Sequence, residues 1–119
     1  MFVKSILNFE KASKEAELIV SDGKYNILCN AWEFDDNNPN FYLSGFFVKN
    51  IMRAYKNEYI VEKLNDSFFS YKLQGKLVDK KNKIVEIGKL TLEIDGYIPN
   101  DILVNEFIEF TVLRIDFTN

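Results

Sequence analysis

The amino-acid sequence predicts an all-β fold: a small single domain, residues 1–119, whose antiparallel strands close into a barrel. Apolar and polar residues alternate along most of the chain, as they do in half-buried strands. Turn-forming pairs such as Asp22-Gly23 and Asp95-Gly96 separate these stretches at short intervals. The apolar content of 47% is typical of a chain that folds around a core rather than a disordered one. We expect about seven to eight strands and at most one short helix.

The first expected strand covers residues 2–9 and is apolar on both faces. Simple alternation divides its apolar residues into two sets, Val3, Leu7 and Phe9 on one face and Phe2 and Ile6 on the other. This pattern predicts a strand that is buried on both sides or that bends across the barrel. A charged connection, residues 10–14, follows it.

Residues 15–20 and 24–31 are predicted to form a hairpin. Both stretches alternate, and Asp22-Gly23 lies between them, where Gly23 can adopt the positive φ that tight hairpin turns require. The polar stretch 35–40, which contains Pro39, is predicted to be a surface loop.

An extended segment is expected over residues 41–47, but residues 47–56 leave helix and strand both open. Ile51, Met52 and Tyr55 recur at helical spacing, whereas the content of β-branched and aromatic residues favours a strand slightly. With a helix here, the order of elements resembles that of an OB-type barrel. That resemblance rests on element order alone.

One long hairpin over residues 68–94 is predicted to organise the chain, after a short strand at 59–63 and a turn at 64–67. Its two arms alternate on either side of a polar turn. The apolar phase slips on the second arm at Gly88, which predicts a β-bulge there.

The final expected strand covers residues 107–117 and also changes its apolar face midway, as a strand does at a barrel corner. A tight turn or short 3₁₀ segment is expected before it, over residues 97–102, where Pro99 restricts φ. Closure into a barrel would remove the exposed edges of these aromatic strands.

Several kinds of chemistry are disfavoured by composition. The chain has no histidine, which removes histidine acid–base catalysis and the common zinc sites. Its only cysteine, Cys29, is predicted to be a buried, inert thiol. The net charge of −3 and the presence of only two arginines disfavour nucleic-acid binding. No stretch has the length and apolarity of a membrane span, and we expect a cytoplasmic protein without a cofactor or metal.

Other charged groups have simple structural interpretations. Asp35 and Asp36 are predicted to be solvated loop residues rather than metal ligands. The pair Asp95 and Asp101 is predicted to form turns rather than to act in glycosidase-type catalysis. Two further sets are expected at the surface, Arg114 with Asp116, and the hairpin-tip lysines Lys80, Lys81 and Lys83.

The positive functional signal is a concentration of aromatic residues around the polar loop. From it we predict a binding surface made of Trp32, Phe34, Phe41 and Tyr42. The first hypothesis is a non-enzymatic interaction module that binds a protein partner or itself. The alternative is an oligonucleotide- or oligosaccharide-binding barrel, with Lys72, Lys76 and Lys89 lining a groove. A carboxylate- or metal-dependent enzyme is the third.

Overall fold

The computed structural model describes residues 1–37, 39–65 and 68–119, and these form eleven strands and no helix. The all-β prediction is therefore confirmed, although the strands outnumber the seven or eight expected. Their bounds are β1 Phe2–Glu10, β2 Glu15–Ser21, β3 Asn26–Ala31, β4 Tyr42–Phe46, β5 Lys49–Arg53, β6 Ile60–Lys63, β7 Tyr71–Asp79, β8 Ile84–Ile87, β9 Leu90–Ile94, β10 Phe107–Val112 and β11 Arg114–Thr118. The loop expected at 35–40 and the turn expected at 64–67 include residues 38 and 66–67, which lie outside the described residues.

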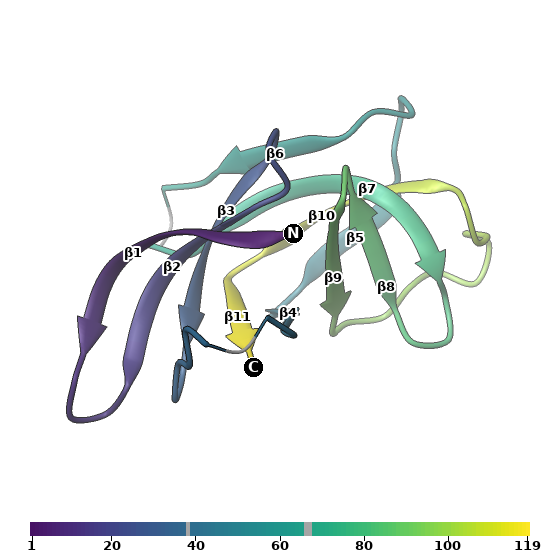
Figure 1. Cartoon of the computed structure of the whole chain (residues 1–119). Coiled ribbons are helices and arrows are strands. Elements are labelled where there is room, and N and C mark those ends of the chain that lie inside the picture. The colour runs from purple at the N-terminus through teal and green to yellow at the C-terminus, as the bar shows by residue number, and fades with distance from the viewer. Residues whose placement is uncertain (38, 66–67) are drawn as a thin grey trace.

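The strands form one continuous, strongly curved sheet that does not close (Figure 1). Their order is β1-β2-β3-β11-β4-β9-β8-β7-β10-β5, and β6 pairs with part of β7. The prediction of a closed antiparallel barrel is wrong in two respects. Within the described residues β1 and β5, at the two ends, do not pair with each other, and the pairs β3–β11 and β4–β9 are parallel. A change of apolar face along a strand indicates bending, but it does not determine whether the sheet's ends meet.

The expected long hairpin is a three-stranded arrangement of β7, β8 and β9. Ile87 pairs with Leu90, so Gly88 and Lys89 form a two-residue turn instead of a bulge. Gly88 has φ 61°, which suits the first central position of a tight hairpin turn. The apolar phase slips at this position because the chain reverses direction, and the apolar residues of both strands remain buried.

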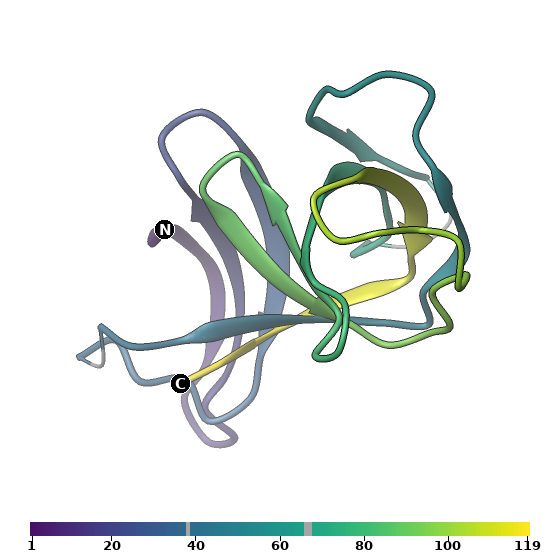
Figure 2. The same ribbon diagram turned by 90° about the vertical axis from the view of Figure 1, so that its right-hand side faces the viewer.

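The expected change of face in residues 107–117 is confirmed, and it occurs where the chain passes from β10 to β11 at Leu113. β10 pairs with β7 and β5, whereas β11 pairs with β3 and β4. Figure 2 shows this yellow segment crossing the molecule toward the C-terminus. The two strands therefore connect the part of the sheet that contains β5 and β7 to the part that contains β3 and β4.

Residues 47–56, for which the sequence left both helix and strand open, contain the strand β5. β5 pairs with β10, and the carboxylate of Asp95 accepts hydrogen bonds from the N–H groups of Phe47 and Val48 just before β5. These bonds fix the β4–β5 connection. The slight preference for a strand over a helix is thus confirmed.

The core lies on the inner, concave side of the curved sheet. Its largest fully buried side chains come from eight strands and from one loop residue, and they include Leu18, Ile27, Leu43, Leu73, Ile87, Leu92, Ile102, Phe110 and Ile115. Tyr71 connects two distant parts of this core, because its hydroxyl oxygen accepts a hydrogen bond from the N–H of Leu28 at 2.9 Å. The described residues contain no helix of the length and apolarity needed to cross a membrane.

Candidate binding groove

β1 lies at one end of the sheet and contains two β-bulges. Its register with β2 shifts between Val3 and Ser5 and again between Ile6 and Asn8. Each bulge adds one residue and resets the alternation, so residues three apart reach the same face. The inner-face pairs are Val3 with Val20, Ile6 with Leu18, and Phe9 with Ala16.

The face assignment made from simple alternation is therefore wrong for β1. Ile6 joins Val3 and Phe9 on the inner face, and Leu7 falls at a bulge. The two bulges explain why this strand is apolar at positions that an alternating strand would keep polar. An i, i+3, i+6 pattern of apolar residues is the sequence signal for this arrangement, although it resembles helical spacing.

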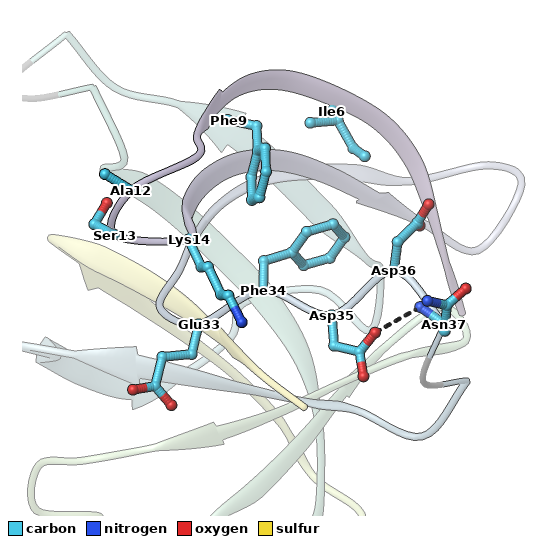
Figure 3. A pocket seen from close by; sticks show the side chains of 10 residues that line it. All are labelled: Ile6, Phe9, Ala12, Ser13, Lys14, Glu33, Phe34, Asp35, Asp36 and Asn37. Carbon is cyan, nitrogen blue, oxygen red and sulfur yellow. Dashed lines mark hydrogen bonds between the residues drawn. The ribbon is translucent and has the colours of Figure 1, made fainter.

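A groove of about 980 Å³ lies between the inner face of β1 and the chain that follows β3 (Figure 3). Figure 3 shows Phe9 on β1 pointing toward Phe34 on the facing segment, with Ile6 further along β1. The Phe9 and Phe34 rings meet edge to face, with centroids 6.4 Å apart. Phe34 is only 7% exposed, whereas Ile6 and Phe9 are 45% and 46% exposed. Apolar surface on β1 thus stays open to solvent beside a buried aromatic ring.

The groove continues along β1 into a second hollow of about 320 Å³ toward the N-terminus, which shares Phe34, Asp35 and Asp36 with the first. Its aromatic floor is a chain of ring contacts. Phe34 packs edge to face on Phe117 at 5.5 Å, and Phe41 stacks on Phe117 at 4.5 Å. We call the two hollows together the β1 groove. Its lining residues are Met1, Phe2, Val3, Ile6, Phe9, Ala12, Ser13, Lys14, Glu33, Phe34, Asp35, Asp36, Asn37, Pro39, Phe41 and Phe117.

Hydrogen bonds hold the wall opposite β1 in place. The N–H of Phe34 donates to the carbonyl oxygen of Lys14 at 2.8 Å. The side-chain amide of Asn119 donates to the Glu33 carbonyl at 2.9 Å and accepts from the N–H of Asp35 at 3.3 Å. This wall is therefore tied both to the β1–β2 turn and to the end of the described chain.

Carboxylates dominate the charged groups on the groove's rim. Glu33, Asp35 and Asp36 are exposed there, and Lys14 is the only basic residue among the lining residues. Asp35 accepts a hydrogen bond from the N–H of Asn37, which shapes the loop locally. No group of three or more potential metal-ligating side chains occurs in the described residues. The prediction that Asp35 and Asp36 are solvent-exposed is confirmed.

Of the four aromatic residues predicted to form one binding surface, only two line the β1 groove. Phe34 and Phe41 contribute to the floor of the β1 groove. Tyr42 pairs with Thr118, while the neighbouring pair, Phe117 with Leu43, is buried on the inner face, so Tyr42 points outward. Trp32 follows β3 and is 57% exposed, and Tyr42 is 53% exposed.

Ile6 and Phe9 are groove residues that were not among the binding residues predicted from the sequence. Two features of the first strand could have indicated them: its apolar residues on both apparent faces and the i, i+3, i+6 spacing of Val3, Ile6 and Phe9.

On the outer face, Arg114 and Asp116 form an ion pair, with Nε and Oδ1 2.9 Å apart. The Arg114 guanidinium also lies 5.0 Å from the centre of the Phe46 ring, where a cation–π contact is favourable. The two charges are paired, but the expectation that both lie at the surface is wrong for Asp116, which is buried. Cys29 is buried too, and burial together with the nearby Asp116 charge raises the pKa of its thiol.

The remaining charged candidates have structural partners. Asp101 pairs with Arg53 at 3.7 Å, whereas Asp95 binds backbone N–H groups in the β4–β5 connection, so the two do not form an acid–base pair. Lys80 and Lys83 at the hairpin tip donate to carbonyl oxygens of the 96–102 segment. These two lysines attach the hairpin tip to that segment instead of serving only as surface charges.

The three lysines of the oligonucleotide hypothesis lie on two separate elements. Between Lys72 and Lys76 on β7, Gln74 is buried, and its amide donates to two carbonyl oxygens of the β5–β6 connection. Lys89 lies at the separate β8–β9 turn. No protein-family model, curated protein or solved structure matches this chain.

Proposed function

We propose that this protein is a non-enzymatic binding module that receives an extended segment of a partner protein in the β1 groove. The observation that supports this most is the exposure of Ile6 and Phe9 on the inner face of β1, opposite Phe34. Covering apolar surface of this kind is favourable by about 25 cal/mol per Å² removed from water. Clustered exposed apolar side chains beside a groove are typical of interaction surfaces.

The shape of the groove favours an extended peptide over a compact ligand. The groove runs along most of β1, a strand of nine residues. At about 3.3 Å per residue, such a strand spans about 30 Å, which is the length of a peptide of similar size. The segment would insert apolar side chains between Phe9 and Phe34 and along Val3.

Burial of side chains, rather than addition of a strand, is the proposed mode of binding. The outer edge of β1 has no partner among the described strands, but the two bulges interrupt the regular spacing of its N–H and C=O groups. Edge strands with bulges are poor templates for further pairing. The same bulges direct Val3, Ile6 and Phe9 into the groove, where a bound segment would contact them.

The non-enzymatic part of the proposal rests on the available side chains. The chain lacks histidine, and the carboxylates at the groove are exposed to solvent instead of being held in a buried cleft. A binding role needs no cofactor.

Site-specific photo-crosslinking in the native host tests the proposal. A benzophenone amino acid replaces Phe9 in one variant, Tyr42 on the outer face in a second, and Tyr97, an exposed residue far along the chain, in a third. We expect a protein adduct from position 9 that is absent from position 97, and its mass distinguishes a partner from a second copy. An adduct formed only from position 42 would assign binding to the outer face and refute the groove. No adduct at position 9, from a protein that is monomeric by light scattering, would also refute it.

A further inference from the structure

We infer that the segment bound in the β1 groove is basic, with lysine or arginine side chains alternating with apolar ones. This inference rests on the proposed function and specifies the chemistry of the partner. It follows from the distribution of charge in the chain and from the position of the carboxylates relative to the apolar floor.

The net charge of the protein is concentrated in the part of the chain that builds the groove. Residues 1–40 contain seven acidic and four basic residues, whereas residues 41–119 contain eleven of each. The whole net charge of −3 therefore belongs to the first 40 residues. All but two of the lining residues of the β1 groove come from this part. A localised charge of one sign attracts partners of the opposite sign and increases their rate of association.

The carboxylates lie where an apolar segment would bring neighbouring side chains. Asp35 and Asp36 belong to both hollows of the groove and directly follow Phe34 in the chain. In an extended peptide, successive side chains point to opposite sides. A segment that inserts apolar side chains toward Phe9 and Phe34 therefore presents its intervening side chains near the rim, where positive charge meets these carboxylates.

The same charge distribution disfavours a second copy as the occupant. Two copies that met groove to groove would bring two negatively charged regions together, and like charges across an interface oppose association. Charge complementarity thus selects a basic partner segment.

Three fluorescein-labelled nine-residue peptides test the inference by fluorescence anisotropy: one alternating leucine with lysine, one alternating leucine with glutamate, and one alternating serine with lysine. We expect the leucine–lysine peptide to bind at least about tenfold more tightly than either of the others. Its affinity should fall between about 50 mM and about 300 mM salt, because salt screens exposed charges.

Two pairs of matched variants locate the binding. The double variant Asp35→Asn with Asp36→Asn should bind the leucine–lysine peptide about four- to tenfold more weakly and with less dependence on salt. The double variant Glu58→Gln with Glu62→Gln makes the same change in charge at exposed positions outside the groove, and its affinity should be unchanged. Phe9→Ser should abolish tight binding, whereas Leu103→Ser, an exposed apolar residue outside the groove, should not. Circular dichroism verifies that each variant is folded.

The outcomes separate this inference from the proposed function. If the leucine–glutamate peptide binds as tightly as the leucine–lysine peptide and Phe9→Ser weakens both, the groove binds peptides but the basic preference is refuted. If the Glu58 and Glu62 variant loses as much affinity as the Asp35 and Asp36 variant, the attraction is nonspecific and the inference is refuted. If no peptide binds and crosslinking from position 9 captures only a second copy, the basic segment is refuted while binding at the groove remains. If no peptide binds and crosslinking yields nothing, both fail.

Discussion

Replacing Tyr71 with phenylalanine removes one oxygen atom from the core and leaves the backbone N–H of Leu28 without its partner. Tyr71 is buried on β7, and its hydroxyl oxygen lies 2.9 Å from that nitrogen on β3. β3 and β7 are not neighbours in the sheet, so this hydrogen bond connects two strands that no backbone ladder joins. We therefore expect Tyr71→Phe to destabilise the fold even though the ring itself is retained.

The size of the effect follows from the cost of an unsatisfied donor. Leaving a buried polar group without a partner costs about 1–3 kcal/mol, and the partial burial of this bond places the expected loss at about 1–2 kcal/mol. For a chain of 119 residues, this corresponds to a decrease in Tm of about 4–8 °C. The cavity left by the hydroxyl is small and adds little.

Urea and thermal unfolding, followed by far-ultraviolet circular dichroism, measure this loss. Tyr97→Phe provides the matched control, because Tyr97 is exposed and its change should alter the free energy of unfolding by less than about 0.5 kcal/mol. If Tyr71→Phe unfolds at the same urea concentration as the unmodified protein, the connection between β3 and β7 does not contribute to stability. Equal losses in both variants would refute the reasoning as well.

Three further predictions concern the β2–β3 and β8–β9 turns and the buried thiol. Gly88→Ala should cost about 2–3 kcal/mol in urea unfolding, because φ is 61° and the added Cβ would lie 2.6 Å from Asp22 Oδ2. Gly23→Ala should cost only about 1 kcal/mol, since φ is also positive but nothing lies within 4 Å of the added atom, and equal losses would contradict the crowding at Gly88. Partial burial acts to raise the pKa of Asp22, but hydrogen bonds from the N–H groups of Lys89, Tyr25 and Lys24 outweigh it, so the pKa is lowered. The carboxylate therefore stabilises the fold above its unfolded pKa of about 3.9 and loses this effect as the pH falls through the folded value. The unmodified protein should have a higher free energy of unfolding than Asp22→Asn, and this difference should be constant between about pH 5 and 8 and shrink below about pH 4. A difference that persists at lower pH would contradict this role of the carboxylate. Cys29 should not react with a thiol reagent in the folded protein, because burial raises its pKa and excludes the reagent, and rapid reaction without urea would show that the site opens.

Much of the local structure could be predicted from the sequence, because short-range periodicity and turn residues act over only a few positions. The β2–β3 hairpin formed around Asp22-Gly23 as expected, and residues 47–56, whose β-branched and aromatic content slightly favoured a strand, contain β5. The errors arose where one local pattern has two physical causes. At Gly88 a change of apolar phase indicated a bulge, but it came from a reversal of the chain. In β1 two bulges were present, so alternation alone separated Ile6 from Val3 and Phe9, and Leu7 falls at a bulge.

For the candidate site, the sequence correctly indicated an aromatic-rich region around the polar loop but not which of its rings share a surface. Phe34 and Phe41 pack beside β1, whereas Tyr42 points away from it, because the register of β4 with β11 assigns alternate residues to opposite faces. Trp32 is exposed and does not line the groove. Ile6 and Phe9 belong to the groove only because β1 folds back toward the chain that follows β3.

The sequence alone determined that this chain is all-β, where most of its strands lie and which chemistry its side chains do not supply, since these depend on residue type and on neighbours along the chain. Only the tertiary structure decided that the sheet stays open, that two of its strand pairs are parallel and that a groove lies under β1. These features depend on which distant strands pair and in what register, and that choice is made by packing between residues far apart in the sequence.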